Sequence, residues 1–384
     1  MRREEARMGQ EPLRLVQFTR SFHIGGTEVQ VLELLRGLPS SYQLQVSVLE
    51  DAGPLMGSLW KLGHSPVAFP LKGSVAQPNT VYQVYRMAQW LKAQRAELVH
   101  VHDFYSTLIA VPAAKLAGVK VIVGRLDLSH WQGRARRAVH ARLTRMADHV
   151  IANAQAIRNL LVSEEGLPAS RVSVIHNGLD LRRFDARVRE GLKGPLPDTG
   201  GAPVVVHVAN MNHPVKRQED LLLALAMLRH GGTTLHAYLV GDGPRRPELE
   251  KLAAELGVSD TVHFLRHRTD VPAIYTRATF GVLCSNAEGM SNAVMEGMAS
   301  GLPMVVTRVG GNTDLVLDGE RGLVVPPEQP ARLAQAFSRL LSNPEKARGM
   351  GRAARDFVAR ELSLERMIRL HDALYQRVAR GTGA

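Results

Sequence analysis

Residues 279–303 read TFGVLCSNAEGMSNAVMEGMASGLP, and this stretch contains one complete strand-to-helix unit. The apolar run at 279–284 predicts a buried strand. Ser291 is a residue type that caps helix N-termini, and the apolar periodicity after it predicts a helix to about Ser300. A glycine and a proline follow shortly afterwards and favour the end of that helix. The stretch therefore predicts a β-strand, a loop and an α-helix in series.

The same alternation of strand and helix recurs along the chain. Short apolar runs typical of strands lie at 13–18, 44–49, 98–102, 120–123, 149–152, 172–175, 204–208, 236–240, 262–265, 279–284, 304–307 and 322–325. Helical patterns separate many of them, at 27–36, 81–94, 219–229, 247–256, 292–300 and 331–341. Continuous apolar runs indicate strands that are buried on both faces, as in parallel sheets with helical crossovers.

The chain is long enough for two domains, and its composition shows where to divide it. Glycine and proline are dense at 187–203, which predicts a linker there. We therefore expect the α/β class, with two doubly wound, Rossmann-like domains at 1–186 and 204–362 that face each other across a cleft. Ligands of such sheets bind beyond the carboxyl ends of the strands, so the cleft is the expected site.

Composition narrows the class of protein. Of the 384 residues, 45% are hydrophobic and 22% are charged, which excludes a disordered chain. The formal net charge of +12 indicates anionic partners, such as phosphorylated substrates, lipid head groups or nucleic acid. The lone Cys284 excludes an internal disulfide and predicts a reducing compartment. No run suits a signal peptide or a membrane-spanning helix, so we expect a soluble, cytoplasmic protein.

The helix that begins after Ser291 carries the chemistry of the opening stretch. The exposed amides of Asn292 and Ala293 would lie at the positive end of this helix, which suits an anion such as a phosphate. Glu296 lies one turn further on the same face, and Glu288 lies in the preceding loop. Carboxylates beside a phosphate site suit sugar and ribose hydroxyls, whereas an isolated pair of this spacing also fits two solvated glutamates.

Seven segments together carry a longer pattern. They are GGTE at 25–28, HVHD at 100–103, IHNGLD at 175–180, VANMNHPVKRQEDLLLA at 208–224, VGDGP at 240–244, EGMSNAVMEG at 288–297 and GGNTDLV at 310–316. Their order resembles that of the retaining glycosyltransferases of family 4, also called glycosyl transferases group 1, which have the GT-B fold. The resemblance extends over most of the chain.

The resemblance implies transfer of a sugar from a nucleoside-diphosphate sugar to a hydroxyl acceptor, with retained anomeric configuration, in glycan, polysaccharide or glycolipid biosynthesis. It implies three catalytic residues, Lys216, Glu288 and His102. The donor-binding set that it implies is Gly25, Gly26, Asn210, Lys216, Arg217, Leu265, Arg266, Glu288, Gly289, Met290, Ser291, Asn292, Ala293 and Glu296. The acceptor-side set is His102, Asp103, Arg125 and Asp127. The final helix, within 363–384, is expected to pack back on the first domain.

Individual roles follow from the same resemblance. Lys216 would bind the diphosphate, Glu296 the ribose and Glu288 the donor sugar. Many relatives carry an arginine where this chain has Asn210, so more of the diphosphate charge would fall on Lys216, aided by Arg217. The sequence has no Asp-x-Asp, His-Glu-x-x-His or EF-hand pattern. We therefore expect no metal and no cofactor, with Lys216 and the helix amides stabilising the leaving diphosphate.

Several positions have a structural reading beside the functional one. Gly25 and Gly26 either form a turn that needs positive φ or let backbone amides approach a diphosphate. His102, at a strand end, either packs in the interior or contacts substrate. Gly241 and Gly243 read mainly as turn formers, and Cys284 as a small buried residue rather than a nucleophile.

A basic helical segment at 133–148 suggests where the protein works. It contains Arg134, Arg136, Arg137, Arg142 and Arg145, and Trp131 precedes it. Such a helix suits an anionic bilayer, which would place the protein on the inner face of the cell membrane with a lipid-linked acceptor. The alternative is an ordinary solvated face with a soluble glycan acceptor; no motif supports nucleic acid. Other functions left open are a nucleotide-sugar epimerase or phosphorylase of the same fold, and a non-catalytic basic binding protein.

Overall fold

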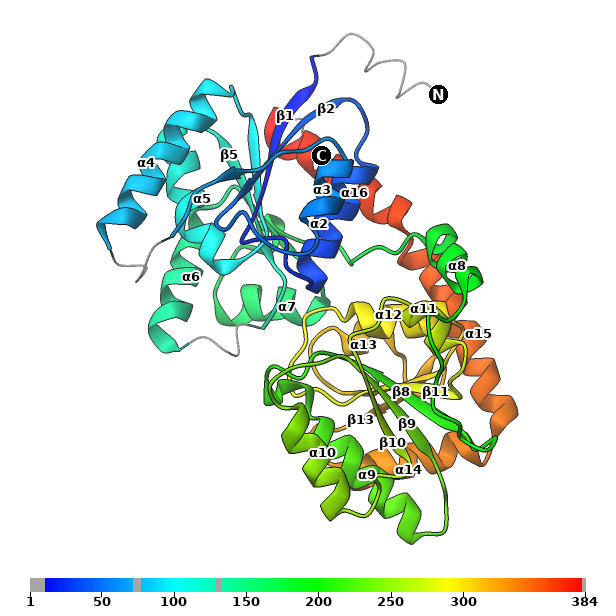
Figure 1. The fold of residues 1–384 in the computed structure, drawn as a ribbon. Coiled ribbons are helices and arrows are strands. Elements are labelled where there is room, and N and C mark those ends of the chain that lie inside the picture. Colours follow the sequence, from blue (N-terminus) through cyan, green and yellow to red (C-terminus); the bar gives the residue numbers. More distant parts are fainter. Residues whose placement is uncertain (1–10, 72–76, 129–132, 382–384) are drawn as a thin grey trace. The chain divides into compact units, whose positions relative to one another are not determined.

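The computed structural model describes residues 11–71, 77–128 and 133–381. The chain forms two compact units (Figure 1). The first unit comprises Met1–Gly178 and Leu364–Ala384, and the second comprises Leu179–Ser363. Each unit contains a parallel sheet, as the buried apolar runs predicted.

The sheet of the first unit has seven strands in the order β3-β2-β1-β4-β5-β6-β7 among the described residues. The strands are β1 Leu13–Thr19, β2 Tyr42–Val48, β3 Val67–Ala68, β4 Leu98–Val101, β5 Lys120–Arg125, β6 His149–Ala152 and β7 Val172–Val174. The helices of this unit are α2 Gly26–Gly37, α3 Met56–Lys61, α4 Pro78–Ala93, α5 Phe104–Ala117, α6 Arg134–Met146, α7 Gln155–Asn159, a π-helical turn Leu160–Glu164, a 3-10 turn Ala169–Arg171 and α16 Leu364–Arg380.

Strand β4 shows why the runs carry apolar residues on both faces. Val99 and Val101 belong to the core that α4 and α5 cover. Leu98 points to the opposite face, where it packs in the core that α2 and α16 cover. Successive side chains of a strand point to opposite faces, so a strand covered on both sides carries apolar residues on both of them.

Helix α16 comes from the far end of the chain and completes the first unit. Figure 1 shows it beside β1, β2 and α2, and its Met367, Leu374 and Tyr375 pack in their common core. A side chain at Gly37 would lie 2.8 Å from Ile368, and one at Gly178 would lie 2.9 Å from Met367. The two glycines therefore make room for the close approach of α16.

The sheet of the second unit has six strands in the order β10-β9-β8-β11-β12-β13. The strands are β8 Val204–Val208, β9 His236–Val240, β10 Val262–Arg266, β11 Phe280–Leu283, β12 Met304–Thr307 and β13 Gly322–Val325. The helices are α8 Leu181–Glu190, a 3-10 turn Pro214–Lys216, α9 Gln218–His230, α10 Arg246–Glu255, α11 Val271–Tyr275, α12 Asn292–Ala299, α13 Asn312–Leu315, α14 Pro330–Leu341 and α15 Pro344–Glu361.

All twelve predicted strands are present, within two residues at each end. Strand β3 was not predicted, because two residues paired to the end of β2 leave no period to detect. The predicted division of the chain needs correction. The units divide after Gly178 rather than at 186, and α8 occupies the start of the segment that we predicted as a linker. Helix α8 packs its Phe184 in the core of the second unit, so it belongs there.

Candidate active site

The loop between β11 and α12 forms the centre of the site in the second unit. Ser291 caps α12, because its side chain accepts a hydrogen bond from the amide of Val294 at 3.3 Å. The amides of Asn292 and Ala293 therefore open the helix, as predicted, and the helix dipole favours negative charge there. A second loop supports this one, since the amide of Gly311 donates to the carbonyl of Gly289 at 2.8 Å.

Gly310 shows how closely these two loops approach. Its φ is +48°, and a Cβ atom there would lie 1.8 Å from the carbonyl oxygen of Glu288. No other residue type fits that space without moving the loop. The GGNTDLV segment therefore holds the Glu288 loop in position.

Lys216 and Glu288 form an ion pair at this loop. The Lys216 Nζ atom donates to Glu288 Oε1 at 2.6 Å, and both side chains are largely buried, with 23% and 10% of their surface exposed. Lys216 ends the 3-10 turn after β8, and Glu288 follows β11, the neighbouring strand. The fold thus brings together two residues that the sequence placed in one site from separate motifs.

Cys284 and Asn286 anchor the turn that carries Lys216. The thiol of Cys284 donates to the carbonyl oxygens of Lys216 and Arg217, at 3.4 and 3.0 Å. The amide of Asn286 donates to the carbonyl of Val215 at 2.8 Å. Burial raises the pKa of the Cys284 thiol far above its ordinary value, so the thiol is a hydrogen-bond donor and not a nucleophile. The sequence indicated that Cys284 is buried but not that it holds this turn.

Arg217 and Asn210 add little uncompensated positive charge to this loop. Arg217 has φ +50°, and its guanidinium binds both carboxylate oxygens of Asp220, at 2.7 and 3.0 Å. Its charge is therefore neutralised by a neighbour at the start of α9. The side chain of Asn210 accepts a hydrogen bond from the amide of Asn212 at 3.4 Å. The structure places neither residue against Glu288.

Glu296 lies one turn into α12. Burial raises the pKa of this carboxyl to about 7, and the charge of Arg187 on α8 opposes the rise. No hydrogen bond or ion pair to this carboxylate is found among the described residues. A carboxyl group in this setting changes its charge near neutral pH.

The end of β10 adjoins the glycine loop that follows β9. Arg266 has φ +55°, and its carbonyl accepts a hydrogen bond from the amide of Gly241 at 2.8 Å; Leu265 precedes it on the strand. Gly241 and Gly243 have positive φ, and a Cβ atom at either would overlap the backbone of the turn after β8. They are turn formers, as predicted, and they bring this loop against the backbone around Asn210.

The first unit contains a cavity of about 440 Å³ at the carboxyl ends of its strands. All four predicted acceptor-side residues line it, together with residues that the sequence did not single out. The lining residues are Arg20, Thr27, Glu28, His102, Asp103, Phe104, Tyr105, Gly124, Arg125, Leu126, Asp127 and His140. Burial lowers the pKa of His102 and of His140 to about 3, so both imidazoles are neutral at pH 7.

Two of the predicted acceptor-side residues also have structural partners. Asp103 caps α5, because its carboxylate accepts from the amide and the hydroxyl of Ser106, at 2.9 and 2.6 Å. The Arg125 guanidinium is buried and binds both oxygens of Glu165, at 2.9 and 2.8 Å. Arg125 therefore lines the cavity with its positive charge already neutralised.

Glu28 is the main functional candidate that the residue-by-residue analysis missed. Burial, together with the charge of Asp103, raises the pKa of this carboxyl. A Cβ atom at Gly25 would lie 2.3 Å from Glu28 Oε2, and the φ of Gly25 is −152°. Gly25 is therefore in extended backbone rather than in a positive-φ turn, which corrects that reading. The signal was available, because Glu28 ends the GGTE segment.

The predicted donor-binding set is divided between the units. Gly25 and Gly26 belong to the first unit, and the remaining members belong to the second. Among the described residues, no group of three or more His, Cys, Asp or Glu side chains is placed to hold a metal ion. In the part of the chain that the structure describes, no helix is both long and apolar enough to cross a membrane.

Comparisons with known proteins agree with this arrangement. Residues 24–183 match the model of glycosyltransferase family 4, and residues 202–343 match that of glycosyl transferases group 1. The chain is 31% identical over 271 residues to a D-inositol 3-phosphate glycosyltransferase of Nocardia farcinica, a match that covers 68% of this chain and 58% of that protein. It is 27% identical over 323 residues to a 2-deoxystreptamine glucosyltransferase of Streptomyces kanamyceticus, covering 78% of this chain and 83% of the relative.

Solved structures show the same fold. Anabaena HepE in complex with UDP superposes with a TM-score of 0.82 at 21% identity, covering 95% of this chain and all of that one. A sucrose-phosphate synthase from Thermosynechococcus elongatus superposes with a TM-score of 0.80 at 19% identity, covering 96% of this chain and all of that one. With its two matched family models and its two parallel-sheet units, the chain belongs to the group 1 glycosyltransferases of family 4, which have the GT-B fold.

Proposed function

We propose that this protein transfers a sugar from a nucleoside-diphosphate sugar to a hydroxyl acceptor, with retention of configuration and without a metal ion. The observation that carries the proposal is the contact of Lys216 with Glu288 in the loop that leads into α12. It combines a cation, a carboxylate and the first amides of a helix N-terminus in one place. Solved structures of HepE are complexes with UDP and with UDP-glucose, which supports a donor of this class here.

Each part of the nucleoside-diphosphate sugar has a chemical partner in this loop and the helix that follows it. The Lys216 ammonium has three N–H donors, so it can bind diphosphate oxygens while it still contacts Glu288. The amides of Asn292 and Ala293 add positive potential where negative charge grows as the glycosidic bond breaks. The Glu288 carboxylate accepts hydrogen bonds from donor-sugar hydroxyls, and Glu296 accepts them from the ribose.

The cavity of the first unit is the proposed acceptor site. Glu28, Asp103 and Asp127 line it and supply carboxylate oxygens, which accept hydrogen bonds from the hydroxyls of a sugar-like molecule. His102 lies among them as a neutral imidazole that contacts the reacting hydroxyl or the donor sugar. Arg125 orders the wall of this cavity through Glu165.

The decisive test is transfer itself. The purified protein is incubated with a panel of nucleoside-diphosphate sugars and candidate glycan or lipid-linked acceptors, and release of nucleoside diphosphate is measured with and without acceptor. Acceptor-dependent release supports a transferase. Conversion of the donor sugar without acceptor would support an epimerase. Formation of a sugar phosphate from phosphate and a glycan would support a phosphorylase. Tight binding without turnover would support a binding protein.

Two finer parts of the proposal have separate tests. The proton NMR spectrum of the first product formed shows whether its anomeric configuration matches that of the donor; an inverted product would contradict retention. For the metal, we expect full activity in EDTA, because Lys216 and the helix amides supply the positive charge. Loss of activity in EDTA that Mg²⁺ or Mn²⁺ restores would contradict this part.

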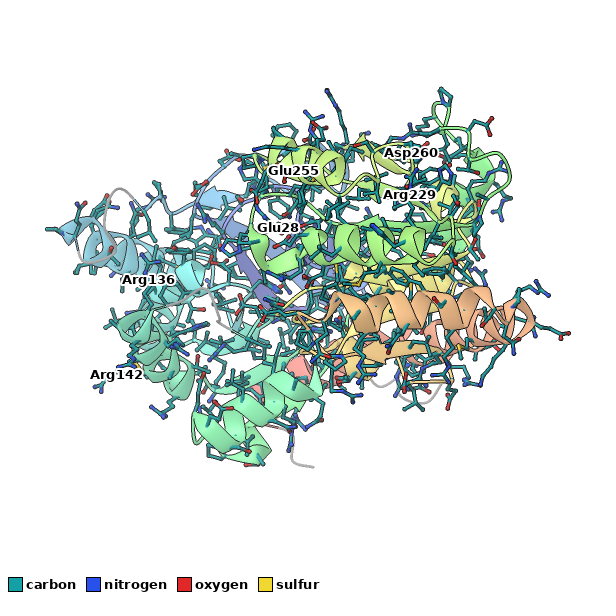
Figure 2. All side chains as sticks on the ribbon, turned by 90° about the horizontal axis from the view of Figure 1, so that it is seen from below. Glu28, Arg136, Arg142, Arg229, Glu255 and Asp260 are labelled. Atoms are coloured by element: carbon teal, nitrogen blue, oxygen red, sulfur yellow. The ribbon has the colours of Figure 1, made fainter. Side chains whose placement is uncertain are left out.

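We also propose that α6 brings the protein to an anionic membrane surface on the cytoplasmic side. Arg134, Arg136, Arg137, Arg142 and Arg145 are all exposed on this helix, and Figure 2 labels Arg136 and Arg142 on its outer side. Val139 and Met146 are exposed on the same helix, at 45% and 42%. Cations around exposed apolar residues suit the boundary of head groups and acyl chains. Trp131, which we expected to contribute, lies outside the described residues.

Liposome sedimentation tests this location. We expect binding that rises with the fraction of anionic lipid, falls with salt, and is lost in the variant R136E/R142E. A matched control changes Arg229 to Glu in the second unit, where the side chain is also exposed and is paired with Asp260 (Figure 2). Equal binding to neutral and anionic vesicles, or no binding, would favour a solvated helix and a soluble acceptor.

A further inference from the structure

A buried polar cluster lies between the sheet of the first unit and α16. Its members are Gln17 on β1, His100 and His102 on β4 and just beyond it, and His371 and Tyr375 on α16. Each of these side chains is at most 5% exposed. Side chains alternate between the two faces of a strand. Leu15 and Leu98 pack in the core that α16 covers, so Gln17, two residues after Leu15, and His100 and His102, two and four residues after Leu98, point to the same face.

Hydrogen bonds connect the cluster from the cavity to the final helix. His102 Nε2 lies 2.6 Å from Gln17 Oε1, and Gln17 Nε2 lies 3.3 Å from the Tyr375 hydroxyl. That hydroxyl lies 2.7 Å from His100 Nδ1. The rings of His100 and His102 lie 4.0 Å apart, so the two imidazoles also restrain each other.

The direction of these bonds determines the tautomer of His102. The carbonyl oxygen of Gln17 can only accept, so His102 Nε2 must carry the ring proton, and Nδ1 is left as the hydrogen-bond acceptor of the ring. Turning the Gln17 amide over would place its NH₂ group on His102 and invert the tautomer. The Tyr375 hydroxyl has one proton. Donating that proton to His100 Nδ1 leaves the hydroxyl as an acceptor towards Gln17, and this keeps the NH₂ group of the amide on the Tyr375 side in a dry interior.

We propose that Tyr375 is a positioning residue for the transfer reaction: through Gln17 it holds His102 in the tautomer that presents Nδ1 to the substrate. The inference rests on the proposed function of His102. It makes α16 part of the acceptor site, although this helix lies more than 250 residues after β4 in the sequence and no α16 residue lines the cavity.

A second buried tyrosine of the same unit offers a matched control. The Tyr42 hydroxyl donates to Asp372 Oδ1 on α16 at 2.6 Å and accepts from Gln376 at 3.0 Å, and its ring packs 6.1 Å from that of Tyr375. Tyr42→Phe therefore removes a buried hydroxyl that contacts the same helix without touching Gln17. A merely structural role of Tyr375 would make the two variants behave alike.

The test compares Tyr375→Phe and Tyr42→Phe in the full chain. We expect Tyr375→Phe to lower kcat by roughly tenfold to a hundredfold with little change in donor KM, as for other groups that orient a reacting residue. Tyr42→Phe should keep kcat within about twofold and should lower the melting temperature by about as much as Tyr375→Phe does. If Tyr375→Phe does not fold, Gln17→Met removes the same link and keeps the length of the side chain.

A second measurement needs no turnover. Long-range ¹H–¹⁵N NMR of histidine-labelled protein reports the tautomer of His102, assigned with His102→Ala. We expect the Nε2-protonated form in the wild type and a mixture of both tautomers in Tyr375→Phe. An unchanged tautomer in that variant would overturn the inference.

The two readouts separate the two levels of the proposal. If the protein transfers sugar but Tyr375→Phe matches Tyr42→Phe in kcat, the inference fails and the proposed function stands. If the wild type transfers no sugar, the proposed function fails, and the NMR result alone decides whether Tyr375 orients this ring.

Discussion

The Lys216 loop of the second unit and the His102 cavity of the first unit are built differently. The Lys216 loop is formed by main-chain amides, glycine contacts and one ion pair between two motif residues. The His102 cavity depends on side chains whose partners lie outside any motif, such as Glu165 for Arg125 and Tyr375 for Gln17. A site of backbone and helix ends can be recognised from local sequence, whereas a site of networked side chains needs the fold.

The largest expected effect tests the local character of the Lys216 loop. Lys216→Ala should lower kcat by roughly 10²–10³, about 3–4 kcal/mol, because it removes a donor from the charge that grows on the leaving diphosphate. The control is Lys251→Ala on α10, whose ion pair with Glu255 at the end of that helix is exposed. Equal kinetics of the two variants would remove Lys216 from the mechanism.

The ion pair of Arg125 with Glu165 in the wall of the His102 cavity has its own test. Arg125→Met should lower the free energy of unfolding by about 3 kcal/mol, the low end for a broken buried pair, because Glu165 is still partly exposed. Arg229→Met breaks the exposed pair with Asp260 in the second unit and should change little. Urea unfolding of both variants is the measurement, and equal stabilities would contradict a structural role for Arg125.

Lowering the pH should destabilise the first unit before it destabilises the second. Burial lowers the pKa values of His100, His102 and His371 below the ordinary 6.5, to about 3 for His102 and about 4 for His371. The unfolded chain then binds more protons than the folded one between these values and 6.5, so stability falls as the pH drops through that window. The first unit also contains His140 and His149 with lowered pKa values, and the second contains His207 and His263.

Hydrogen exchange read by mass spectrometry between pH 7 and pH 4.5 measures this difference. We expect protection to fall first in β4 and α16 of the first unit, and later in β8 and β9 of the second. His371→Leu replaces one of these imidazoles with an apolar side chain and should reduce the pH dependence of the first unit. Simultaneous loss in both units would contradict the expectation.

A smaller pH effect should belong to the second unit alone. Glu296, with its pKa raised to about 7, accepts hydrogen bonds best when ionised, so donor KM should rise as the pH falls below 7. Glu296→Gln should raise donor KM at pH 8 by about fivefold to tenfold, near the worth of a charged hydrogen bond, and remove this pH dependence. Initial rates at several donor concentrations and pH values give both quantities. A donor KM with the same pH dependence in both proteins would assign the ribose elsewhere.

The smallest expected effect concerns the missing arginine. Asn210→Arg in the Lys216→Ala background should recover about twofold to fivefold in kcat at low ionic strength, the range of a partly exposed charge contact. The gain should shrink in 0.5 M salt, because salt screens it. Asn212→Arg, two residues away, is the control. Equal rates in the two double variants would show that residue 210 does not face the diphosphate.

Much of this architecture could be predicted from the sequence, because the physical signals are local. The run 304–307 is apolar or β-branched at every position, and it forms β12 with those limits. Ser291 was recognised as the cap of α12 from its residue type alone. The division of the units was misplaced, because glycine and proline between 187 and 203 indicate irregular chain but not which core the preceding helix joins. Phe184 decides that question through its packing.

For this protein, the sequence by itself determined the parallel α/β units, the helix N-terminus at Asn292, and the residue types of the loop that leads into α12, because strand burial, capping and glycine requirements act over a few residues. Only the tertiary structure decided that Lys216 contacts Glu288, that Cys284 holds the Lys216 turn, and that Arg125 binds Glu165. It also decided that α16 places Tyr375 against Gln17, the hydrogen-bond partner of His102. These contacts join residues that are remote in sequence, and their geometry exists only once the strands have paired and both faces of each sheet are covered.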